Sequence, residues 1–427
     1  MRRITGVFAI VILTSMVVHS QSGHLDPSFS TGQGFDGIVT CLALQSGGML
    51  AVGGYFANFG TNVRSSLARL HSDGALDLDF RPVATGLRVV TMQSDCFERL
   101  VVGGNGIAMA RYLYDGTHDP EFYGPYDTCV WLGRHSGGGI YYSSSREFKR
   151  IRTDGSPDSA FASAFVYAWD YGIFAACIRK DGSIIIGGGF NYINYFRRDG
   201  LALLDSFGNV STNHFLTGPG ESVGCIIEQP DGKILVTGDF TGSIRRYTAE
   251  GMPDGSFTPE YLVDDDGHPG SILCMALQRD GKIVIGGRFT SIGGQPASRL
   301  ARLLPDGTID GNFDIGTGAD NVVRTILLQP DGRIVVGGSF TSWNGSPVGR
   351  IVRLLGDAPV LKMTTGLEGQ TVLSWPAVYA DYAMQSATNL TAPGWRFVKN
   401  DGNVIDQQFF FTNLISAGNV FFRLMKP

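Results

Sequence analysis

The sequence lacks the short motifs on which most enzyme and cofactor chemistry depends. Its 427 residues contain no zinc-ligand spacing, phosphate-binding loop, nucleophile elbow or kinase signature. The seven histidines are isolated from one another, which is typical of surface or loop residues rather than metal ligands. The residue pattern therefore predicts no cofactor and no metal, and it names no reaction.

Concentrated positive charge is also missing. The net charge is −5, and Lys and Arg are scattered along the chain. Because nucleic-acid binding needs clustered basic residues, no nucleic-acid partner is expected. An acidic run, Asp264-Asp265-Asp266-Gly267, resembles part of a calcium loop but lacks the later ligands, so we expect a solvated acidic loop.

Long hydrophobic runs are absent, with one exception at the N-terminus. Arg2 and Arg3 precede an apolar run from Val7 to Val18, and a signal-peptidase pattern follows at 18–20. This pattern predicts a signal peptide over residues 1–20, with the mature chain starting near Gln21. The run is short for a membrane anchor. We expect an exported protein, secreted or on the cell surface, with no membrane span after cleavage.

Cysteine is sparse, and its placement argues against a disulfide framework. Three of the six cysteines stand four residues before a glutamine at one repeated position, and two more fall within a step or two of it: Cys41, Cys225 and Cys274, then Cys129 and Cys177. A disulfide needs Cα atoms within about 7 Å, whereas cysteine is also a small buried residue. Free, buried thiols are expected, and disulfides stay the alternative.

Glycine, in contrast, is abundant and regularly placed. A hydrophobic run ending in Gly-Gly recurs about every fifty residues, and an Asp-Gly turn followed by Asp and Phe recurs with it. The runs are LAVGG at 50–54, LVVGG at 100–104, IIIGG at 184–188, IVIGG at 283–287 and IVVGG at 334–338. Repetition at this period is typical of a ring or a solenoid.

One repeat, Ile272 to Phe313, shows the expected local structure. Two Asp-Gly turns separate apolar runs, which is the strongest short signal for a β-hairpin. Two turns make four antiparallel strands, the size of one propeller blade. Seven such units start near Ile38, Arg88, Cys129, Ile173, Val223, Ile272 and Val322. The expected fold is therefore an all-β, seven-bladed β-propeller over residues 21–357.

The last unit is incomplete, and the N-terminus carries the missing piece. The repeat stops after Leu355, whereas Leu25 to Phe29 matches Ile309 to Phe313, the outer strand of the sixth unit. We expect this N-terminal segment to supply the outer strand of the last blade and to close the ring.

A three-residue turn places residues eight apart opposite each other on two strands. Arginine and aspartate occupy such positions in five units, and we predict structural ion pairs rather than a catalytic ring. The same rule leaves Arg353 and Asp26 without local partners, so we predict that they pair across the closure. The pairs within units are Arg69 and Asp77, Arg111 and Asp119, Arg150 and Asp158, Arg246 and Asp254, and Arg302 and Asp310.

Units such as LQPDGRIVVGGSFT (328–341), EQPDGKILVTGDFT (228–241) and ARLLPDGTIDGNF (301–313) resemble the delta-60 repeat of secreted bacterial β-propellers. The resemblance covers residues 24–355. It implies an exported propeller that binds or scaffolds, and it brings no catalytic residues.

Residues 358–427 depart from the repeat. Five alternating apolar segments predict a small all-β domain: Thr371 to Trp375, Tyr382 to Ser386, Trp395 to Val398, Gln408 to Thr412 and Val420 to Leu424. The LSW, YAMQSATNL and terminal FFRL stretches resemble a fibronectin-like β-sandwich module of exported proteins from Verrucomicrobia-type bacteria.

Loops between the second and third strands are long in the first, sixth and seventh units, at 57–65, 290–298 and 341–349. These units are neighbours in a closed ring, so the loops should form one patch with exposed aromatic residues that contacts a protein or a glycan. The alternative is that these are ordinary loop lengths for the repeat. The candidate binding residues are Asn58, Phe59, Arg64, Gln295, Trp343 and Asn344.

Two functions of different classes remain open at this stage. The first is a non-enzymatic binding or scaffolding protein, expected to be a monomer, and a purely structural role is not separable from it. The second is a propeller-based carbohydrate-active enzyme, a lyase or glycosidase, with its site at the channel mouth. That function needs clustered acids, whereas the first strands carry mainly Cys, Thr, Val, Leu and Gln, with Arg88, Arg179 and Arg324 as exceptions.

Overall fold

The computed structural model describes residues 22–425 apart from 83–87, 96, 105–108, 168–170, 216–217, 241–242, 358–361, 366–370, 377–382, 388–393, 399–402, 406–407 and 414–420. The predicted signal peptide, residues 1–20, lies outside the described residues. The chain divides into two compact units, one of which comprises Gly23–Gln329 with Arg333–Leu355. The second contains Gly356–Pro427. No helix among the described residues is long and apolar enough to cross a membrane.

The first unit is all-β, and its described part contains seven sheets in which a first, a second and a third strand pair antiparallel in chain order, four of them with a short hairpin between the second and the third strand. The first strands are β1 (Ile38–Leu44), β6 (Val89–Ser94), β9 (Trp131–Arg134), β13 (Gly172–Ile178), β18 (Val223–Glu228), β22 (Ser271–Leu277) and β27 (Val323–Leu328). The second strands are β2 (Leu50–Tyr55), β7 (Leu100–Gly104), β10 (Ile140–Ser143), β14 (Ile184–Gly189), β19 (Ile234–Gly238), β23 (Ile283–Arg288) and β28 (Ile334–Gly338). The third strands are β5 (Leu67–Leu70), β8 (Ala110–Tyr112), β11 (Glu147–Ile151), β17 (Leu201–Leu204), β20 (Ile244–Tyr247), β26 (Leu300–Leu303) and β31 (Ile351–Leu354).

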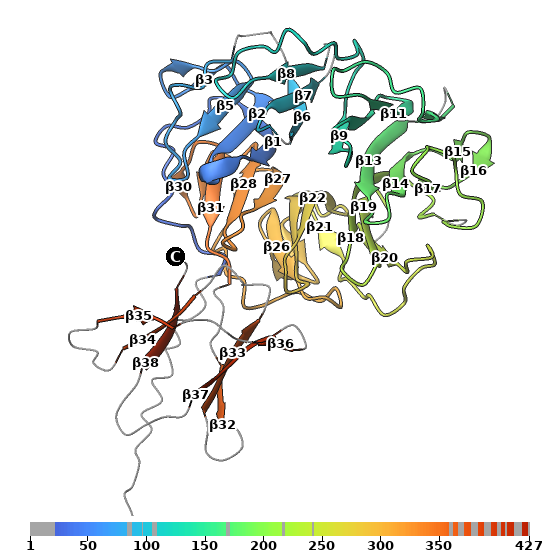
Figure 1. The fold of residues 1–427 in the computed structure, drawn as a ribbon. Coiled ribbons are helices and arrows are strands. Elements are labelled where there is room, and N and C mark those ends of the chain that lie inside the picture. The colour runs from blue at the N-terminus through green and yellow to red at the C-terminus, as the bar shows by residue number, and fades with distance from the viewer. Residues whose placement is uncertain are drawn as a thin grey trace, which may run out of the picture. The chain divides into compact units, whose positions relative to one another are not determined.

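The first strands follow one another in a cyclic order around a common centre (Figure 1). Each contacts the first strands of the sheets before and after it, and β27 contacts β1. No sheet within the described residues closes on itself. The one helical element among them is a 3-10 turn at Ser46–Gly48.

The predicted fourth strand of each unit is shorter than expected. In its place a single β-bridge closes the turn after the third strand in each of the first six sheets, and β12 (Ala164–Phe165) is a separate short strand that pairs with β11. Pairing ends there because the aspartate carbonyl accepts the N–H of the phenylalanine three residues later and turns the backbone away, as Asp310 does for Phe313 at 3.1 Å. The bridges are Leu70 with Leu76, Tyr112 with His118, Ile151 with Pro157, Leu204 with Val210, Tyr247 with Pro253 and Leu303 with Ile309.

In the last sheet this bridge comes from the other end of the chain. Leu25 bridges antiparallel to Leu354, and the Asp26 N–H donates to the Arg353 carbonyl at 2.8 Å. Gly23 N–H and Leu355 N–H extend the pairing, because each donates to a carbonyl of the other segment at 2.8 Å. The N-terminal segment therefore occupies, against β31, the position that the chain's own continuation occupies in the other sheets.

The Gly-Gly pattern has a steric cause. A Cβ on Gly53 would lie 2.6 Å from Val89 Cγ1, on the first strand of the next sheet. A Cβ on Gly54 would overlap the carbonyl oxygen of Ile38, on the paired strand. The first glycine thus allows the next sheet to pack closely, and the second allows close approach of the backbone of the paired strand in its own sheet. The equivalent pairs Gly187-Gly188, Gly286-Gly287 and Gly337-Gly338 show the same contacts.

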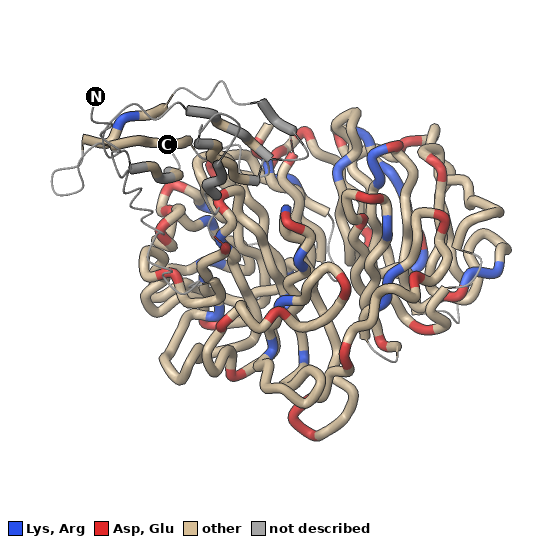
Figure 2. The backbone as a smooth tube through the Cα atoms, turned by 90° about the horizontal axis from the view of Figure 1, so that it is seen from below, with Lys and Arg blue, Asp and Glu red and all other residues tan. Residues whose placement is uncertain are grey.

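Charged residues are spread through the first unit rather than gathered by sign, with Lys and Arg lying among Asp and Glu along the backbone (Figure 2). The hydrophobic core lies between adjacent sheets. One cluster joins Tyr141 and Phe148 of the third sheet to Ile184 and Ile186 of the fourth. Burial therefore depends on contact between sheets, not on any single sheet.

The second unit contains two sheets among its described residues. One has the order β32 (Lys362–Thr365), β33 (Thr371–Pro376), β37 (Gln408–Asn413) and β36 (Asn403–Ile405), and the other has β35 (Arg396–Phe397), β34 (Ala383–Ala387) and β38 (Phe421–Met425). Leu373 and Trp375 of the first sheet pack in one cluster with Met384 of the second, and Trp375 stacks on Phe409 at 5.2 Å between ring centroids. Strands therefore occur near each segment that the sequence indicates, with β32 and β36 in addition.

Candidate binding surface

Among the described residues, four hairpins stand between the second and third strands of their sheets. They are β3 (Asn58–Phe59) with β4 (Asn62–Val63), β15 (Tyr192–Ile193) with β16 (Phe196–Arg197), β24 (Ser291–Ile292) with β25 (Gln295–Pro296), and β29 (Ser342–Trp343) with β30 (Ser346–Pro347). Because they occupy the same position in the repeat, they lie on the same side of their sheets. Loop length in the sequence predicts three of them, and β15–β16 in the fourth unit is an additional one.

Two of the three hairpins chosen from sequence, β29–β30 and β3–β4, are joined through the segments that precede them. The Asn344 N–H donates to the Gly318 carbonyl at 2.9 Å, and the Phe35 N–H donates to the Gly349 carbonyl at 3.1 Å. The Gly60 N–H donates to the Gly34 carbonyl at 2.8 Å. Backbone contacts thus connect the tip of β29–β30 to the segment before it, and its base to the tip of β3–β4.

Two predicted contact residues in this patch are not exposed. Phe59 is 7% exposed and Trp343 is 0% exposed, so the prediction of an exposed aromatic surface there is wrong. The cause is the alternation of side chains along a strand. Both residues end the first strand of their hairpin and form a bridge to the preceding segment, Phe59 with Phe35 and Trp343 with Ala319.

The four polar residues of the predicted patch have different environments. Asn58 Nδ2 donates to Asp36 Oδ2 at 2.8 Å, and Asn344 Oδ1 accepts the Gly318 N–H at 2.8 Å. Arg64 is half-buried, and its guanidinium donates to the Val63 carbonyl at 2.8 Å. Gln295 is exposed at its hairpin tip. Asn58, Arg64 and Asn344 therefore support the local backbone, and any contact with a partner is a separate proposal.

The β15–β16 hairpin differs from the others because its aromatic side chains face solvent. Tyr195 is 75% exposed, Phe196 41% and Tyr192 39%. We call the touching rings of Phe165, Tyr167, Tyr192 and Tyr195 the tyrosine cluster. Ring centroids of Tyr195 lie 5.5 Å from Phe165 and 5.9 Å from Tyr167, and those of Tyr167 and Tyr192 lie 6.1 Å apart.

Local hydrogen bonds hold the tyrosine cluster together. Asn194 Oδ1 accepts the Phe165 N–H at 2.8 Å, and the Asn194 N–H donates to the Phe165 carbonyl at 3.0 Å. At the base of the hairpin the buried Arg198 donates to the carbonyls of Arg197 and Ser211, each at 2.6 Å. The hairpin is thus fixed to β12 and to the turn after β17, so the exposed rings stand on a supported backbone.

The turn of this hairpin is strained. Asn194 and Tyr195 have φ of 45° and 71°, whereas the corresponding tips are Gly293-Gly294 and Asn344-Gly345. Two consecutive left-handed residues favour Asn-Gly or Gly-Gly, because a side chain in this conformation costs on the order of 1 kcal/mol. Tyrosine therefore stands where two of the three other hairpins use glycine. Such strain clusters at functional sites.

Two electrostatic features accompany the tyrosine cluster, the raised pKa of Tyr167 and the exposed ion pair of Arg197. Desolvation raises the pKa of Tyr167, and the neighbouring Tyr195 and Tyr192 act in the same direction. Arg197 is 73% exposed in its side chain, and its Nε lies 3.4 Å from Asp199 Oδ1. An exposed pair of this kind contributes little, so Arg197 can exchange Asp199 for another anion.

The six predicted arginine and aspartate pairs have one geometry. Arginine Nε lies 2.7 Å from an aspartate Oδ2 in Arg69–Asp77, Arg111–Asp119 and Arg150–Asp158, 2.8 Å in Arg246–Asp254 and Arg353–Asp26, and 2.9 Å in Arg302–Asp310. Each guanidinium also lies over a phenylalanine ring, 4.6 Å from the centroid of Phe313 in the case of Arg302. Five of them donate to a turn carbonyl of the next sheet, as Arg246 does to Pro305 at 2.6 Å. These pairs act between sheets rather than at a site.

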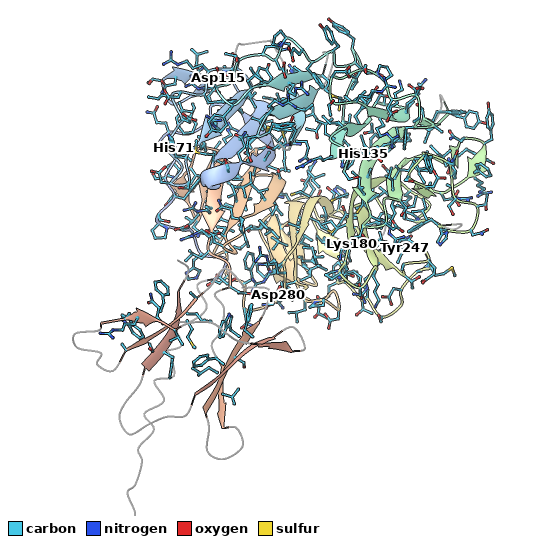
Figure 3. All side chains as sticks on the ribbon, viewed as in Figure 1. His71, Asp115, His135, Lys180, Tyr247 and Asp280 are labelled. Carbon is cyan, nitrogen blue, oxygen red and sulfur yellow. The ribbon has the colours of Figure 1, made fainter. Side chains whose placement is uncertain are left out.

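A group of acidic residues and a histidine between β21 (Leu262–Val263) and β22 has the spacing of metal ligands. Asp264, Asp266 and His268 are the only group of three in the described residues whose ligand atoms could share a metal ion. Arg288 lies 3.8 Å from Asp264 and 3.7 Å from Asp266, and Arg299 donates to Asp265 at 2.6 Å. The acidic loop is therefore ion-paired. Other histidines are separate, as His71 after β5 and His135 after β9 illustrate in Figure 3.

Comparison with known proteins supports the repeat architecture. A family model described as a β-propeller domain of unknown function, DUF5122, matches residues 45–80, 229–257, 278–313 and 329–357. No curated protein matches the sequence. Among solved structures, virginiamycin B lyase from Staphylococcus aureus, in a catalytically inactive form with quinupristin, is similar with a TM-score of 0.51 and 10% identity. This match covers 76% of the present chain and 96% of the lyase.

The WD40 β-propeller domain of Doa1 is similar to the same degree. Its TM-score is 0.51 at 14% identity, and the match covers 75% of the present chain and 93% of that domain. Identities this low show the fold alone, because one fold hosts many unrelated functions. The repeated sheets, the four matched segments and these structural relatives lead to one conclusion: the chain is a β-propeller repeat protein.

Proposed function

We propose that this protein is an exported, non-enzymatic binding propeller that contacts its partner through the hairpins on one side of its sheets, with the tyrosine cluster as the main contact. The carrying observation is that Tyr195 is 75% exposed at a strained turn, where two equivalent turns use glycine. Exposed tyrosines on a fixed backbone are typical of binding hot spots.

The proposal includes the finer architecture expected from the sequence. Seven consecutive sheets in cyclic order and the Leu25–Leu354 bridge support seven blades closed by the N-terminal strand, of the delta-60 type. The shared core of Leu373, Trp375 and Met384 supports a β-sandwich for residues 358–427. The apolar run at 7–18 supports export through a signal peptide over residues 1–20. We propose a monomer.

The alternative of a lyase or glycosidase is less well supported. Six of the first strands carry a bulge near their start, and bulges often re-aim side chains toward a site. The bulged residues are Thr40, Val90, Phe174, Gly224, Leu273 and Arg324. None of these is a carboxylic acid, whereas glycosidases use a pair. Glu228, an acid on β18, pairs with Arg179 at 2.9 Å.

A capture experiment tests the proposal. The purified full chain is immobilised and exposed to the cell envelope and culture medium of its source, and bound protein and carbohydrate are both analysed. We expect specific capture that is lost with Tyr192→Ala and Tyr195→Gly. The matched control is Tyr126→Ala, because Tyr126 is 95% exposed and lies outside the tyrosine cluster. Capture that is equal in all variants would contradict the proposal, as would cleavage of a captured polysaccharide.

A further inference from the structure

The size of the tyrosine cluster limits what it can bind. A fully buried aromatic side chain contributes about 150 to 250 Å², so at the observed exposures Tyr192 and Tyr195 of the cluster, together with the adjacent Phe196, offer on the order of 300 Å². A stable protein interface needs about 800 Å² on each partner. The cluster is therefore small for a protein partner but sufficient for a few sugar residues.

The arrangement of the rings leaves their faces open. Tyr195 meets Phe165 at 85° and Tyr167 at 74°, and Tyr167 meets Tyr192 at 77°. An edge-to-face contact covers a face of only one of its two rings, and Tyr195 is 75% exposed, so most of its ring stays available to a ligand. A pyranose ring has an apolar C–H face and a rim of hydroxyl groups. Open phenol faces that carry hydroxyl groups match both features.

The charge beside the cluster favours an acidic sugar. Arg197 follows Phe196 on β16 and is 73% exposed in its side chain. Its Nε lies 3.4 Å from Asp199 Oδ1 in an exposed pair that a ligand carboxylate can displace. Arginine binds carboxylates through two parallel N–H donors, a geometry that an ammonium group does not offer. Arg146 is also exposed, and its carbonyl accepts the Val166 N–H at 2.9 Å, next to Tyr167.

We propose that the tyrosine cluster and Arg197 form a site for a polysaccharide that carries carboxylate groups, such as a polyuronate. Tyr192 and Tyr195 stack on sugar faces, and Arg197 pairs with a uronate. Tyr195 adopts a strained backbone conformation at the hairpin tip, and this places an aromatic ring where a glycine would present no side chain. This inference rests on the proposed binding function and names its ligand.

Titration calorimetry with the purified full chain tests the inference. The probes are alginate and the same polymer after reduction of its carboxyl groups, which removes the charge and keeps the sugar chain. We expect wild-type protein to bind alginate, and Tyr195→Gly to weaken binding about tenfold or more. Arg197→Gln should weaken alginate binding about fivefold and leave the weaker binding of the reduced polymer unchanged. Tyr126→Ala is the matched control and should bind as wild type.

Thermal unfolding separates binding from folding. Because glycine relieves the strain at φ of 71°, Tyr195→Gly should not lower the unfolding temperature while it weakens binding. Equal binding of alginate and reduced alginate, or no binding of either, overturns the inference. If alginate does not bind but Tyr195→Gly still abolishes capture in the preceding experiment, the binding function stands and its ligand is a different one. If captured material is protein alone, the polysaccharide inference is likewise wrong.

Discussion

Arg353 and Asp26 are 327 residues apart in the chain, and their side chains form a buried ion pair with Nε 2.8 Å from Oδ2. Arg353 also donates to Ser28 Oγ at 3.0 Å and to the carbonyl of Ser72 in the first sheet. Arg333 Nε lies 2.7 Å from the same Asp26 oxygen. One guanidinium therefore joins the N-terminal segment, the last sheet and the first sheet.

Replacing Asp26 by asparagine should destabilise the protein strongly. Asp26→Asn leaves the buried Arg353 without its counter-charge, which typically costs about 3 to 5 kcal/mol. Urea unfolding measures the change. Asp79→Asn, at an exposed aspartate close to the Arg69–Asp77 pair, is the control and should stay within about 0.5 kcal/mol of wild type. A loss below about 1 kcal/mol in Asp26→Asn would mean that the closure does not depend on this pair.

Stability should fall at acidic pH for the same reason. Burial acts to raise the pKa of Asp26, but hydrogen bonds from Ser28 and the charge of Arg353 outweigh it, so the pKa lies below its usual 3.8. The unfolded chain then binds the proton more readily, and the stabilisation is fully present above about pH 5 and is lost as pH falls through the folded-state pKa. The pKa is also lowered for the aspartates of the other five pairs, Asp77, Asp119, Asp158, Asp254 and Asp310.

Urea unfolding at pH 6 and at pH 3 checks this dependence. The free energy of unfolding should be smaller at pH 3, and the difference should shrink in Asp26→Asn because asparagine does not titrate there. An unchanged difference in the variant would show that Asp26 does not contribute.

The second glycine of each Gly-Gly should tolerate no side chain. Gly54→Ala places a Cβ onto the Ile38 carbonyl oxygen, and the strands must separate, so we expect a loss of about 3 kcal/mol or more. Gly255→Ala is the matched control because no atom lies within 4 Å of its Cβ position. Thermal unfolding of both variants measures the effect. Similar unfolding temperatures for the two variants would refute the steric explanation.

Thr237 offers a stabilising substitution. It replaces the first glycine of the pattern in the fifth unit, is 0% exposed, and its Oγ1 has no hydrogen-bond partner. Valine has the same shape without the hydroxyl, so Thr237→Val should raise the free energy of unfolding by about 1 kcal/mol. Thr258→Val, at an exposed position, should change it by less than about 0.5 kcal/mol. A destabilised Thr237→Val would imply a role for the hydroxyl.

The buried thiols should be unreactive. Desolvation raises the pKa of Cys41 and of Cys129 to about 12, and neither is in a disulfide. At pH 8 about one in ten thousand of these thiol groups is then ionised, and only the thiolate form reacts. Iodoacetamide should leave both cysteines unmodified in the folded protein and modify both in urea, as peptide mass spectrometry can show. Rapid modification of either in the folded protein would contradict the raised pKa of these thiols.

Local rules made much of the fold predictable. Asp-Gly turns and Gly-Gly runs indicate the strands, and the all-β class follows from them. Pairs eight residues apart depend only on a turn length, so Arg302 and Asp310 could be named from the sequence alone. The predicted fourth strands are longer than the observed ones. The turn at Asp310 that ends strand pairing depends on a hydrogen bond from the Phe313 N–H to the Asp310 carbonyl, and the alternation of apolar residues does not indicate this bond.

The candidate binding surface was harder to predict from the sequence. Phe59 and Tyr192 both lie on the first strand of a hairpin, yet Phe59 is buried and Tyr192 is exposed, because one points toward the preceding segment and the other away. Loop length does not reveal that direction. A signal existed in the run Phe190 to Phe196, which has four aromatic residues in seven positions, three of them in the β15–β16 hairpin of the fourth unit.

By itself the sequence determined the period, the strands and the pairs of residues that a turn brings together, because these depend on neighbours along the chain. Only the tertiary structure decided which aromatic rings are covered and which gather at the surface. Exposure depends on the segments that pack against a hairpin, and the rings of Phe165 and Tyr195 meet because two Asn194 hydrogen bonds hold distant segments side by side. The same dependence on distant segments places Asp26 against Arg353.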